Sequence, residues 1–511
     1  MPHLLNREFM IERPYRSVRR CYATILETPD SLAWIIFAAV AANTLAYIVM
    51  FSNPVIRSDA WYFLDVFVRK ALDGTLRLGD FFVQRGGMDH AQPLRKLILL
   101  MDLRYFDLDF RYEALAGWFA ALVSLLILRR LIFWHDAPDK SFRGMRVWLW
   151  AGLCVAFVSL NSTDVWGWPL VTGSYTSYAL LFATLLGLWR WLALGRAGLF
   201  MLSALAFDLA ADDTAMLVNI ACLLALAITI WQNPPMRTRA IKGAAMLIGC
   251  FVVVRIGYAI LFTPPPGFHM ALDKRLGNLS SDFLDGGWWQ WAIVPLASSV
   301  SFILPLEHFT GDRARMLQLL VGIGLLLAHG WFWSRVLWKR PAMSAPAFAA
   351  IVLMLVFYAL VAGIIYGRVS IFGNAYLNQP RYVLAYSFNT VALLLMCASC
   401  TWDAAAVGGA IRKPALVALI ALLIAWQIPL SRLAWSVGPY IKAYQQKMAS
   451  QLGEMAQDPG TRPTQCAPEL VVCGYTETKR AELVRLLKQH RLNVFSPRVQ
   501  RTTRLDPYPP R

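Results

Sequence analysis

Charged residues are scarce in this chain of 511 residues. Only 16% of the residues are Asp, Glu, Lys or Arg, and 58% are hydrophobic, whereas soluble domains carry about 25% charged residues. Several apolar runs reach roughly 18 residues or more, which is long enough for a helix to cross a bilayer. The scarcity of charge therefore excludes an ordinary soluble domain. It predicts an all-α polytopic membrane protein with about 11–12 membrane helices.

Acidic residues are fewer than basic ones, 31 against 49 Lys and Arg, so the formal net charge is +18. Such an excess is also found in nucleic-acid-binding proteins. Here much of it falls in short loops and tails, where membrane proteins place cytoplasmic cations. The sequence contains no basic helix interleaved with stacking aromatic residues. We therefore expect membrane lipids, and no nucleic acid, among its partners.

Sequence motifs for metal or nucleophilic chemistry are missing, since there is no HExxH, DxD or GxSxG pattern. We therefore predict no metal and no cofactor. Six of the eight cysteines fall in or beside apolar runs and are expected to be inert. Cys466 and Cys473 form the only pair in the polar C-terminal tail. Their spacing permits a disulfide, which would place the tail in an oxidising compartment.

The apolar runs and the basic loops between them predict the topology. Basic clusters in alternate loops indicate a cytoplasmic N-terminus and an external C-terminus, in a bacterial inner membrane. Residues 288–306 are short, apolar and interrupted by two prolines, so we expect a re-entrant or interfacial segment. Crossings are predicted near residues 31–51, 114–134, 147–163, 177–194, 198–212, 214–232, 243–263, 315–337, 345–367, 383–400 and 414–430.

Three regions follow from this map: a cytoplasmic tail over residues 1–30, a transmembrane domain over 31–430 that includes an external loop at 52–113, and a small external domain over 431–511. Within the last region, Leu470–Val472 and Leu492–Phe495 are predicted as strands, and Glu477–His490 as an amphipathic helix. The C-terminal domain is therefore expected to be α/β. We expect it to lean on the membrane domain, because it is too small to bury much core alone.

The external loop at 52–113 is the one long polar insertion near the N-terminus. Ser58 is predicted to cap an amphipathic surface helix that runs to about Leu72, with Gly74 just beyond its end. Asp59 would then lie in the first turn, where the helix dipole stabilises its ionised form. An ionised carboxylate at the membrane rim could act as a general base. The alternative is that Asp59 only complements the dipole.

A second surface helix is predicted to begin at Pro93. Arg95 and Lys96 fall at its start, where cations oppose the dipole and therefore call for an anionic partner. That partner could be a lipid-linked phosphate or ordinary phospholipid head groups. Asp89 and His90, just before the helix, offer an acid/base pair, although a single loop histidine is often structural.

Arg368, Arg381 and Tyr382 flank a second external loop. Cations are usually concentrated in cytoplasmic loops, so external arginines suggest a specific role. They could bind a lipid-linked phosphate, or they could pair with Asp59 or another acid of the first loop.

This layout resembles the GT-C superfamily of integral membrane glycosyltransferases. The resemblance rests on an Asp shortly after the first helix, a long first external loop with surface helices, and an external C-terminal domain. The run from His90 to Arg95, followed by Leu100–Phe106, also resembles the first loop of poorly characterised bacterial membrane proteins of this architecture. In that group a His-x-Glu-His-Arg-like run is common, and here Gln92 and Pro93 replace the acid and the second His.

The resemblance implies an inverting glycosyltransferase that uses a polyprenyl-phosphate-sugar donor. Asp59 would be the catalytic base, and the Arg381 loop would be a site for the lipid phosphate. The acceptor could be a glycan, a lipid or a protein. Two alternatives remain open. A transporter or flippase would use the acidic cluster Asp208, Asp212 and Asp213, and a polysaccharide polymerase or ligase of another fold would rely on a large late external loop.

Overall fold

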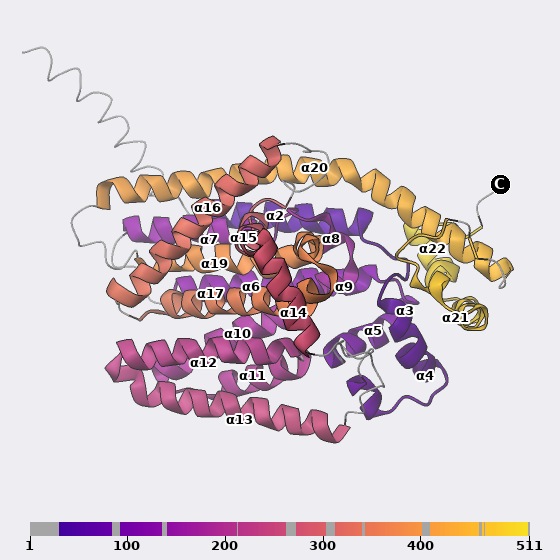
Figure 1. Ribbon diagram of the computed structural model, residues 1–511, viewed down its shortest axis with the longest axis horizontal. Coiled ribbons are helices and arrows are strands. Elements are labelled where there is room, and N and C mark those ends of the chain that lie inside the picture. Colours follow the sequence, from indigo (N-terminus) through magenta and orange to yellow (C-terminus); the bar gives the residue numbers. More distant parts are fainter. Residues whose placement is uncertain are drawn as a thin grey trace, which may run out of the picture.

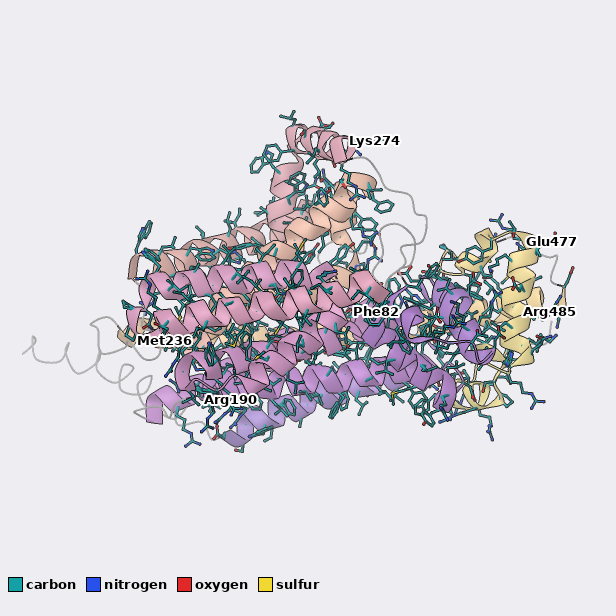
Figure 2. All side chains as sticks on the ribbon, turned by 90° about the horizontal axis from the view of Figure 1, so that it is seen from below. Phe82, Arg190, Met236, Lys274, Glu477 and Arg485 are labelled. Atoms are coloured by element: carbon teal, nitrogen blue, oxygen red, sulfur yellow. A yellow bond between two sulfur atoms is a disulfide. The ribbon has the colours of Figure 1, made fainter. Side chains whose placement is uncertain are left out.

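The computed structural model describes residues 30–83, 92–134, 140–211, 213–261, 272–302, 312–339, 343–400, 409–458, 462–463 and 465–508. The regular secondary structure of these ranges is helical, and they contain no strand. The long helices form one bundle. The short helices of the first loop lie together with residues 465–508, which we call the C-terminal segment, at one end of the bundle (Figure 1). We refer to this end as the loop end. Arg190 and Met236 lie at the opposite end from Glu477 and Arg485 (Figure 2).

The bundle confirms the prediction of an all-α polytopic membrane protein. Nine helices of the described ranges are long and apolar enough to cross a membrane. The helices of the bundle are α2 (Asp30–Phe51), α6 (Arg111–Ile132), α7 (Lys140–Phe157), α10 (Ser174–Leu194), α11 (Gly198–Ala211), α12 (Asp213–Gln232), α13 (Arg237–Leu261), α16 (Asp312–Ser334), α17 (Ala345–Ile364), α19 (Val383–Cys400) and α20 (Gly409–Gln457).

All eleven predicted apolar runs form helices, but two of them fall short of a full crossing. Helix α11 has 14 residues, a length of about 21 Å against roughly 30 Å of bilayer hydrocarbon. Helix α7 has 18 residues, and Lys140, Arg143 and Arg146 in its first two turns reduce its apolar length. The described ranges thus hold nine candidate spans, against eleven or twelve predicted for the whole chain.

Short helices connect the bundle helices. Helix α15 lies in the segment predicted to be re-entrant, and its 11 residues with an internal Pro295 are too few to cross a bilayer. The short elements of the bundle are α8 (Thr163–Gly167), α9 (Pro169–Thr172), η4 (Pro234–Met236), α14 (Leu272–Asp282), η5 (Phe283–Gly287), α15 (Trp288–Ser298), η7 (Arg335–Lys339), η8 (Ile365–Val369), α18 (Ser370–Phe372), η9 (Asn374–Asn378) and η10 (Pro380–Tyr382).

The bundle is closely packed where glycines let backbones approach each other. A Cβ added at Gly117 of α6 would lie 2.1 Å from the carbonyl oxygen of Thr172, and one added at Gly187 of α10 would lie 2.6 Å from the Cα of Phe200. Both distances are well inside van der Waals contact. The first contact fixes the position of α9 against α6, at the loop end of the bundle.

The first loop and the C-terminal segment share a second hydrophobic core. The loop contributes Trp61 and Phe67, and the C-terminal segment contributes Leu483 and Val494, all of them buried. The elements are α3 (Ala60–Phe63), η1 (Leu64–Val68), α4 (Arg69–Leu72), η2 (Leu78–Phe82), α5 (Pro93–Phe106), η11 (Val471–Gly474), α21 (Glu477–Gln489), η12 (Asn493–Phe495) and α22 (Pro497–Thr503). The C-terminal segment thus packs on the first loop and on the end of α20, which adds Met448 and Leu452 to the same core.

The predicted α/β character of the C-terminal region is wrong, because its described residues form helices and no strands. Val471 and its neighbours form the 3₁₀ turn η11, and Asn493–Phe495 forms the 3₁₀ turn η12. These runs are apolar because Val472 and Val494 are completely buried in the shared core. A short apolar run has the same composition in a buried turn as in a strand. The predicted boundary at residue 431 also falls inside the continuous helix α20.

Candidate functional site

The surface helix of the first loop places Asp59 at its start. The helix begins at Ala60 and continues through a π-helical turn to Leu72, and Gly74 follows with φ +69°. Asp59, not the predicted Ser58, is the N-cap residue. Ser58 has φ +50°, and its backbone N–H donates to the carbonyl oxygen of Glu469 over 2.7 Å. The C-terminal segment therefore holds the backbone immediately before Asp59, whose side chain is partly buried.

Two arginines converge on one tryptophan, Trp168. The guanidinium of Arg57 lies 4.4 Å from the centre of the Trp168 ring, and that of Arg381 lies 5.9 Å from it. Arg381 also donates a hydrogen bond to the hydroxyl of Tyr376. Within the described ranges, the buried Nε of Arg57 has no hydrogen-bond partner. We call Arg57, Trp168 and Arg381 the arginine–tryptophan cluster.

Asp164 is a buried carboxyl group that interacts electrostatically with both arginines of this cluster. It lies in α8, four residues before Trp168. Burial raises the pKa of Asp164; the positive charges of Arg57 and Arg381 act in the opposite direction, and the negative charge of Glu469 adds to the rise. One carboxyl group of raised pKa thus faces two guanidinium groups. Glu469 adds a second carboxyl group that offsets part of this positive charge. The guanidinium N–H groups are nevertheless hydrogen-bond donors of the kind that binds a phosphate group.

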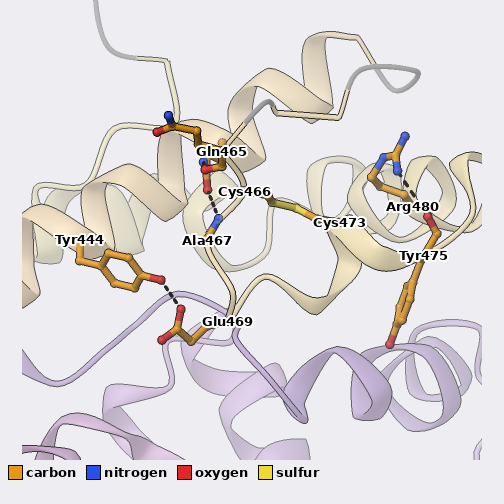
Figure 3. Close-up of a disulfide and its surroundings, with 9 residues drawn as sticks. Tyr444, Gln465, Cys466, Ala467, Glu469, Cys473, Tyr475 and Arg480 are labelled. Atoms are coloured by element: carbon orange, nitrogen blue, oxygen red, sulfur yellow. Dashed lines mark hydrogen bonds between the residues drawn. A yellow bond between two sulfur atoms is a disulfide. The ribbon is translucent and has the colours of Figure 1, made fainter.

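A disulfide-closed turn brings Glu469 to the same site (Figure 3). Cys466 and Cys473 are joined, and Glu469 lies between them in the chain. The side chain of Glu469 accepts a hydrogen bond from the hydroxyl of Tyr444 on α20. The turn is further held by Gln451, whose side-chain oxygen accepts from the backbone N–H of Ala467 over 3.0 Å. The disulfide therefore supports the segment that contacts Ser58.

Arg95 and Lys96, adjacent in sequence, have different environments. Arg95 forms an ion pair with Glu113 of α6 over 3.1 Å and donates to the carbonyl oxygen of Leu170 over 3.3 Å. Lys96 is completely buried. Its ammonium group donates to the carbonyl oxygens of Asp80, Phe81 and Val83 over 2.6–3.1 Å. Lys96 thus fixes the end of η2, and this placement does not favour a role in substrate binding.

Two cavities meet at Arg95. A larger cavity of about 130 Å³ lies between α5, α6, α10, α11 and α12, and a small one of about 10 Å³ lies between α5 and the arginine–tryptophan cluster. Arg95 and Leu170 line both cavities. Arg57 and Trp168 line the small one. The larger cavity therefore adjoins the small cavity that Arg57 and Ala60 line.

The remaining predicted site residues are placed as follows. Tyr382 lies beside Arg381, whose guanidinium is 5.3 Å from the centre of its ring. Arg368 lies in η8 and is partly buried. Asp89 and His90 lie outside the described residues. Asp208 accepts a hydrogen bond from Asn219 of α12 over 2.6 Å, which links two adjacent helices.

Sequence reasoning missed Arg57, Asp164, Trp168, Glu113 and Glu469. Arg57 could have been noticed as a cation two residues before Asp59. The other four come from segments that are distant in sequence, and only the fold brings them together. No group of three or more His, Cys, Asp or Glu residues in the described part of the chain is arranged to hold a metal ion.

Asp102 of α5 is a buried acid that lies away from these cavities. It is 2% exposed, and within the described part neither carboxylate oxygen has a hydrogen-bond partner. Burial, followed by the negative charges of Glu113, Asp109 and Asp107, raises its pKa well above the usual value. The folded protein therefore keeps this carboxyl group protonated at pH values where the unfolded chain has already released the proton.

This shift predicts a pH-dependent effect of Asp102→Leu on stability. Because the folded pKa is raised, the wild type loses stability as the pH rises from about 4, the usual Asp value, through the raised pKa. The variant lacks this loss. We therefore expect the thermal midpoint of the variant, measured relative to that of the wild type, to rise between pH 4.5 and pH 7.5. Asp73→Leu, at an exposed position, controls for the loss of one negative charge. A difference between the two thermal midpoints that stays constant with pH would contradict the prediction.

No protein-family model, curated protein or solved structure matches this chain. The site combines a partly buried carboxylate at a helix N-terminus, two guanidinium groups on an aromatic ring, and a cavity between the first loop and the membrane helices. A carboxylate can accept a proton from a hydroxyl group, and the guanidinium groups can stabilise a departing phosphate.

Proposed function

We propose that this protein is a GT-C-like membrane glycosyltransferase that moves a sugar from a polyprenyl-phosphate carrier to an acceptor hydroxyl. The observation that carries the proposal is the position of Arg57. Its guanidinium lies 4.4 Å from the centre of the Trp168 ring, two residues before Asp59, and its buried Nε has no hydrogen-bond partner within the described ranges. An aromatic ring orders the guanidinium and leaves its N–H groups for an anion.

In this proposal the side chains of the site have separate roles. Asp59 accepts the proton of the acceptor hydroxyl group, and the oxygen attacks the anomeric carbon. The bond between that carbon and the phosphate oxygen breaks, and the polyprenyl phosphate leaves with the electron pair. Arg57 and Arg381 stabilise the charge that develops on the phosphate. Attack and departure occur on opposite faces of the sugar, so the anomeric configuration is inverted.

The proposal places the loop end on the external side of a bacterial inner membrane, with the N-terminus cytoplasmic. Two features support this orientation. The disulfide between Cys466 and Cys473 lies at the loop end and suits an oxidising compartment. The opposite end carries Arg129 and Arg130 at the end of α6, and Arg237 and Arg239 at the start of α13, in keeping with the positive-inside bias.

Deletion of the protein from its native host tests the proposed activity. We expect the surface glycans of the deletion strain, analysed by mass spectrometry, to lack one sugar that the wild-type gene restores. If the glycans of the two strains are identical, the glycosyltransferase proposal fails.

Arg57→Gln tests the role of the arginine–tryptophan cluster. We expect transfer by the purified variant to fall about 100-fold, as when one preorganised donor to a developing anion is removed. The matched control is Arg432→Gln, at an exposed arginine of α20, which should transfer at the wild-type rate. Wild-type activity of Arg57→Gln would remove the cluster from the mechanism.

A further inference from the structure

The larger cavity at the loop end contains polar groups that have no partner in the described part of the chain. Its walls come from α5, α6, α10, α11 and α12. The side chain of Glu113 is 2% exposed; Oε2 accepts from Arg95, whereas Oε1 has no partner within the described part of the chain. The side-chain oxygen of Gln92 is also buried and without a partner there. Two acceptors left unpaired in a buried cavity are costly unless a ligand or water binds them.

The backbone at Gln92 gives a second sign of a built site. Gln92 precedes the first residue of α5 and has φ +52°, in the left-handed region that residues other than glycine rarely adopt. Such strain is found more often at ligand sites than elsewhere. In Gln92 it coincides with a side chain that lines the cavity.

The charge of the cavity is balanced by the protein itself. Among the described residues that line it, Arg95 and Glu113 alone have charged side chains, and they form an ion pair over 3.1 Å. A charged ligand would be buried without a counter-ion, which is strongly unfavourable. The cavity therefore suits a neutral ligand.

The size and lining of the cavity further restrict the class of ligand that can fit. Its volume of about 130 Å³ is close to that of roughly 150 Å³ cavities that hold one six-membered ring. Ser177 and Tyr178 of α10 add hydroxyl groups, and Leu170 and Phe207 add apolar surface. A sugar ring presents both hydroxyl groups and C–H faces, so it matches both kinds of wall.

We infer that this cavity binds a single neutral monosaccharide ring, and that it excludes uronic acids and sugars with a free amino group. Glu113 and Gln92 accept hydrogen bonds from the sugar hydroxyls, while Leu170 and Phe207 contact its C–H faces. The assignment of this ring to the donor or the acceptor rests on the proposed function. In either case the shared lining residue Arg95 brings the ring next to the small cavity that Arg57 lines.

Cysteine labelling in membrane nanodiscs tests the inference without requiring transfer activity. Ser177→Cys places a thiol in the cavity wall, and the rate of its reaction with a small methanethiosulfonate is measured. We expect methyl glucopyranoside to slow this reaction, and methyl glucuronide and glucosamine to leave it unchanged. Ser436→Cys, on an exposed part of α20, should be slowed by none of these probes. Failure of every neutral methyl hexoside and pentoside to protect, or equal protection by the charged probes, overturns the inference.

Two further variants test the residues assigned to the ring. Adding Glu113→Gln or Tyr178→Phe to Ser177→Cys should raise the protecting concentration of the glycoside, about tenfold for Glu113→Gln, as for loss of a hydrogen bond to a charged group. Tyr178→Phe leaves the ion pair intact and so remains informative if Glu113→Gln does not fold. Protection unchanged in both variants overturns the assignment of these residues.

Enzyme kinetics distinguish the source of the ring and separate this inference from the proposed function. Inhibition by the glycoside that competes with the lipid-linked donor assigns the cavity to the donor sugar, and competition with the acceptor assigns it to the acceptor. A protein that is protected by the glycoside but transfers no sugar supports the binding site and contradicts the proposed function. A protein that transfers sugar but is never protected contradicts the site alone.

Discussion

Asp59→Asn should reduce sugar transfer by about 1,000-fold, within the range expected for loss of a general base. Asn has nearly the shape of Asp but cannot accept the acceptor proton. Because Asp59 makes no side-chain hydrogen bond that caps α3, the substitution should leave the surface helix in place. The measurement is the rate of transfer by purified protein, together with the surface glycans of a complemented deletion strain at matched protein level.

The matched control is the same substitution at the other end of the same surface helix. Asp73 is the C-cap residue of α4 and is exposed, so Asp73→Asn should transfer at the wild-type rate. If Asp59→Asn retains activity while the deletion loses a sugar, Asp59 only complements the helix dipole and another base must be sought. If both variants lose activity equally, the effect is on the helix and the assignment of Asp59 also fails.

Asn493→Ala should detach the C-terminal segment from the backbone that precedes Asp59. The buried side chain of Asn493 accepts from the N–H of Ile56 over 3.1 Å and donates to the carbonyl oxygens of Pro54 and Leu108, each over 2.7 Å. Its φ of +54° is also one that Asn adopts more readily than Ala. The loss of these bonds in a buried site should cost about 3 kcal/mol.

Amide hydrogen exchange measures this loss where it occurs. The N–H groups of Ile56 and Ser58 donate to the C-terminal segment, and a cost of about 3 kcal/mol corresponds to exchange roughly 100-fold faster. Gln489→Ala, at an exposed amide of α21, is the control and should exchange as the wild type does. Unchanged protection of Ile56 and Ser58 in Asn493→Ala would show that other contacts fix this backbone.

The helices could be predicted from the sequence because apolar length is a local property. Every predicted apolar run forms a helix, and the surface helix from Ala60 to Leu72 was also expected. The prediction of two strands was wrong, because Val472 and Val494 are apolar residues buried in the core that is shared with the first loop. Burial against a distant partner and pairing in a sheet leave the same short apolar pattern.

The candidate site could be predicted only in part. Asp59 and Arg381 could be selected as candidates because each is a polar residue beside a predicted membrane helix. Trp168 and Glu469 meet them only through contacts between segments more than 80 residues apart. Arg95 and Lys96 show a further limit, since adjacent residues on a helix project about 100° apart, so one lines a cavity and the other is enclosed.

Helix α20 has a consequence for how the site is held. It is continuous over 49 residues from the bundle to the C-terminal segment (Figure 1), a length of about 74 Å at 1.5 Å per residue. A single inserted residue would turn everything beyond it by about 100°. Tyr444 lies on this helix and Glu469 follows it, so the residue count of α20 sets the angle at which the disulfide-closed turn meets Ser58. The number of residues in α20 therefore fixes both the distance and the rotation of the disulfide-closed turn relative to the bundle. The geometry of the site depends on this length as well as on its side chains.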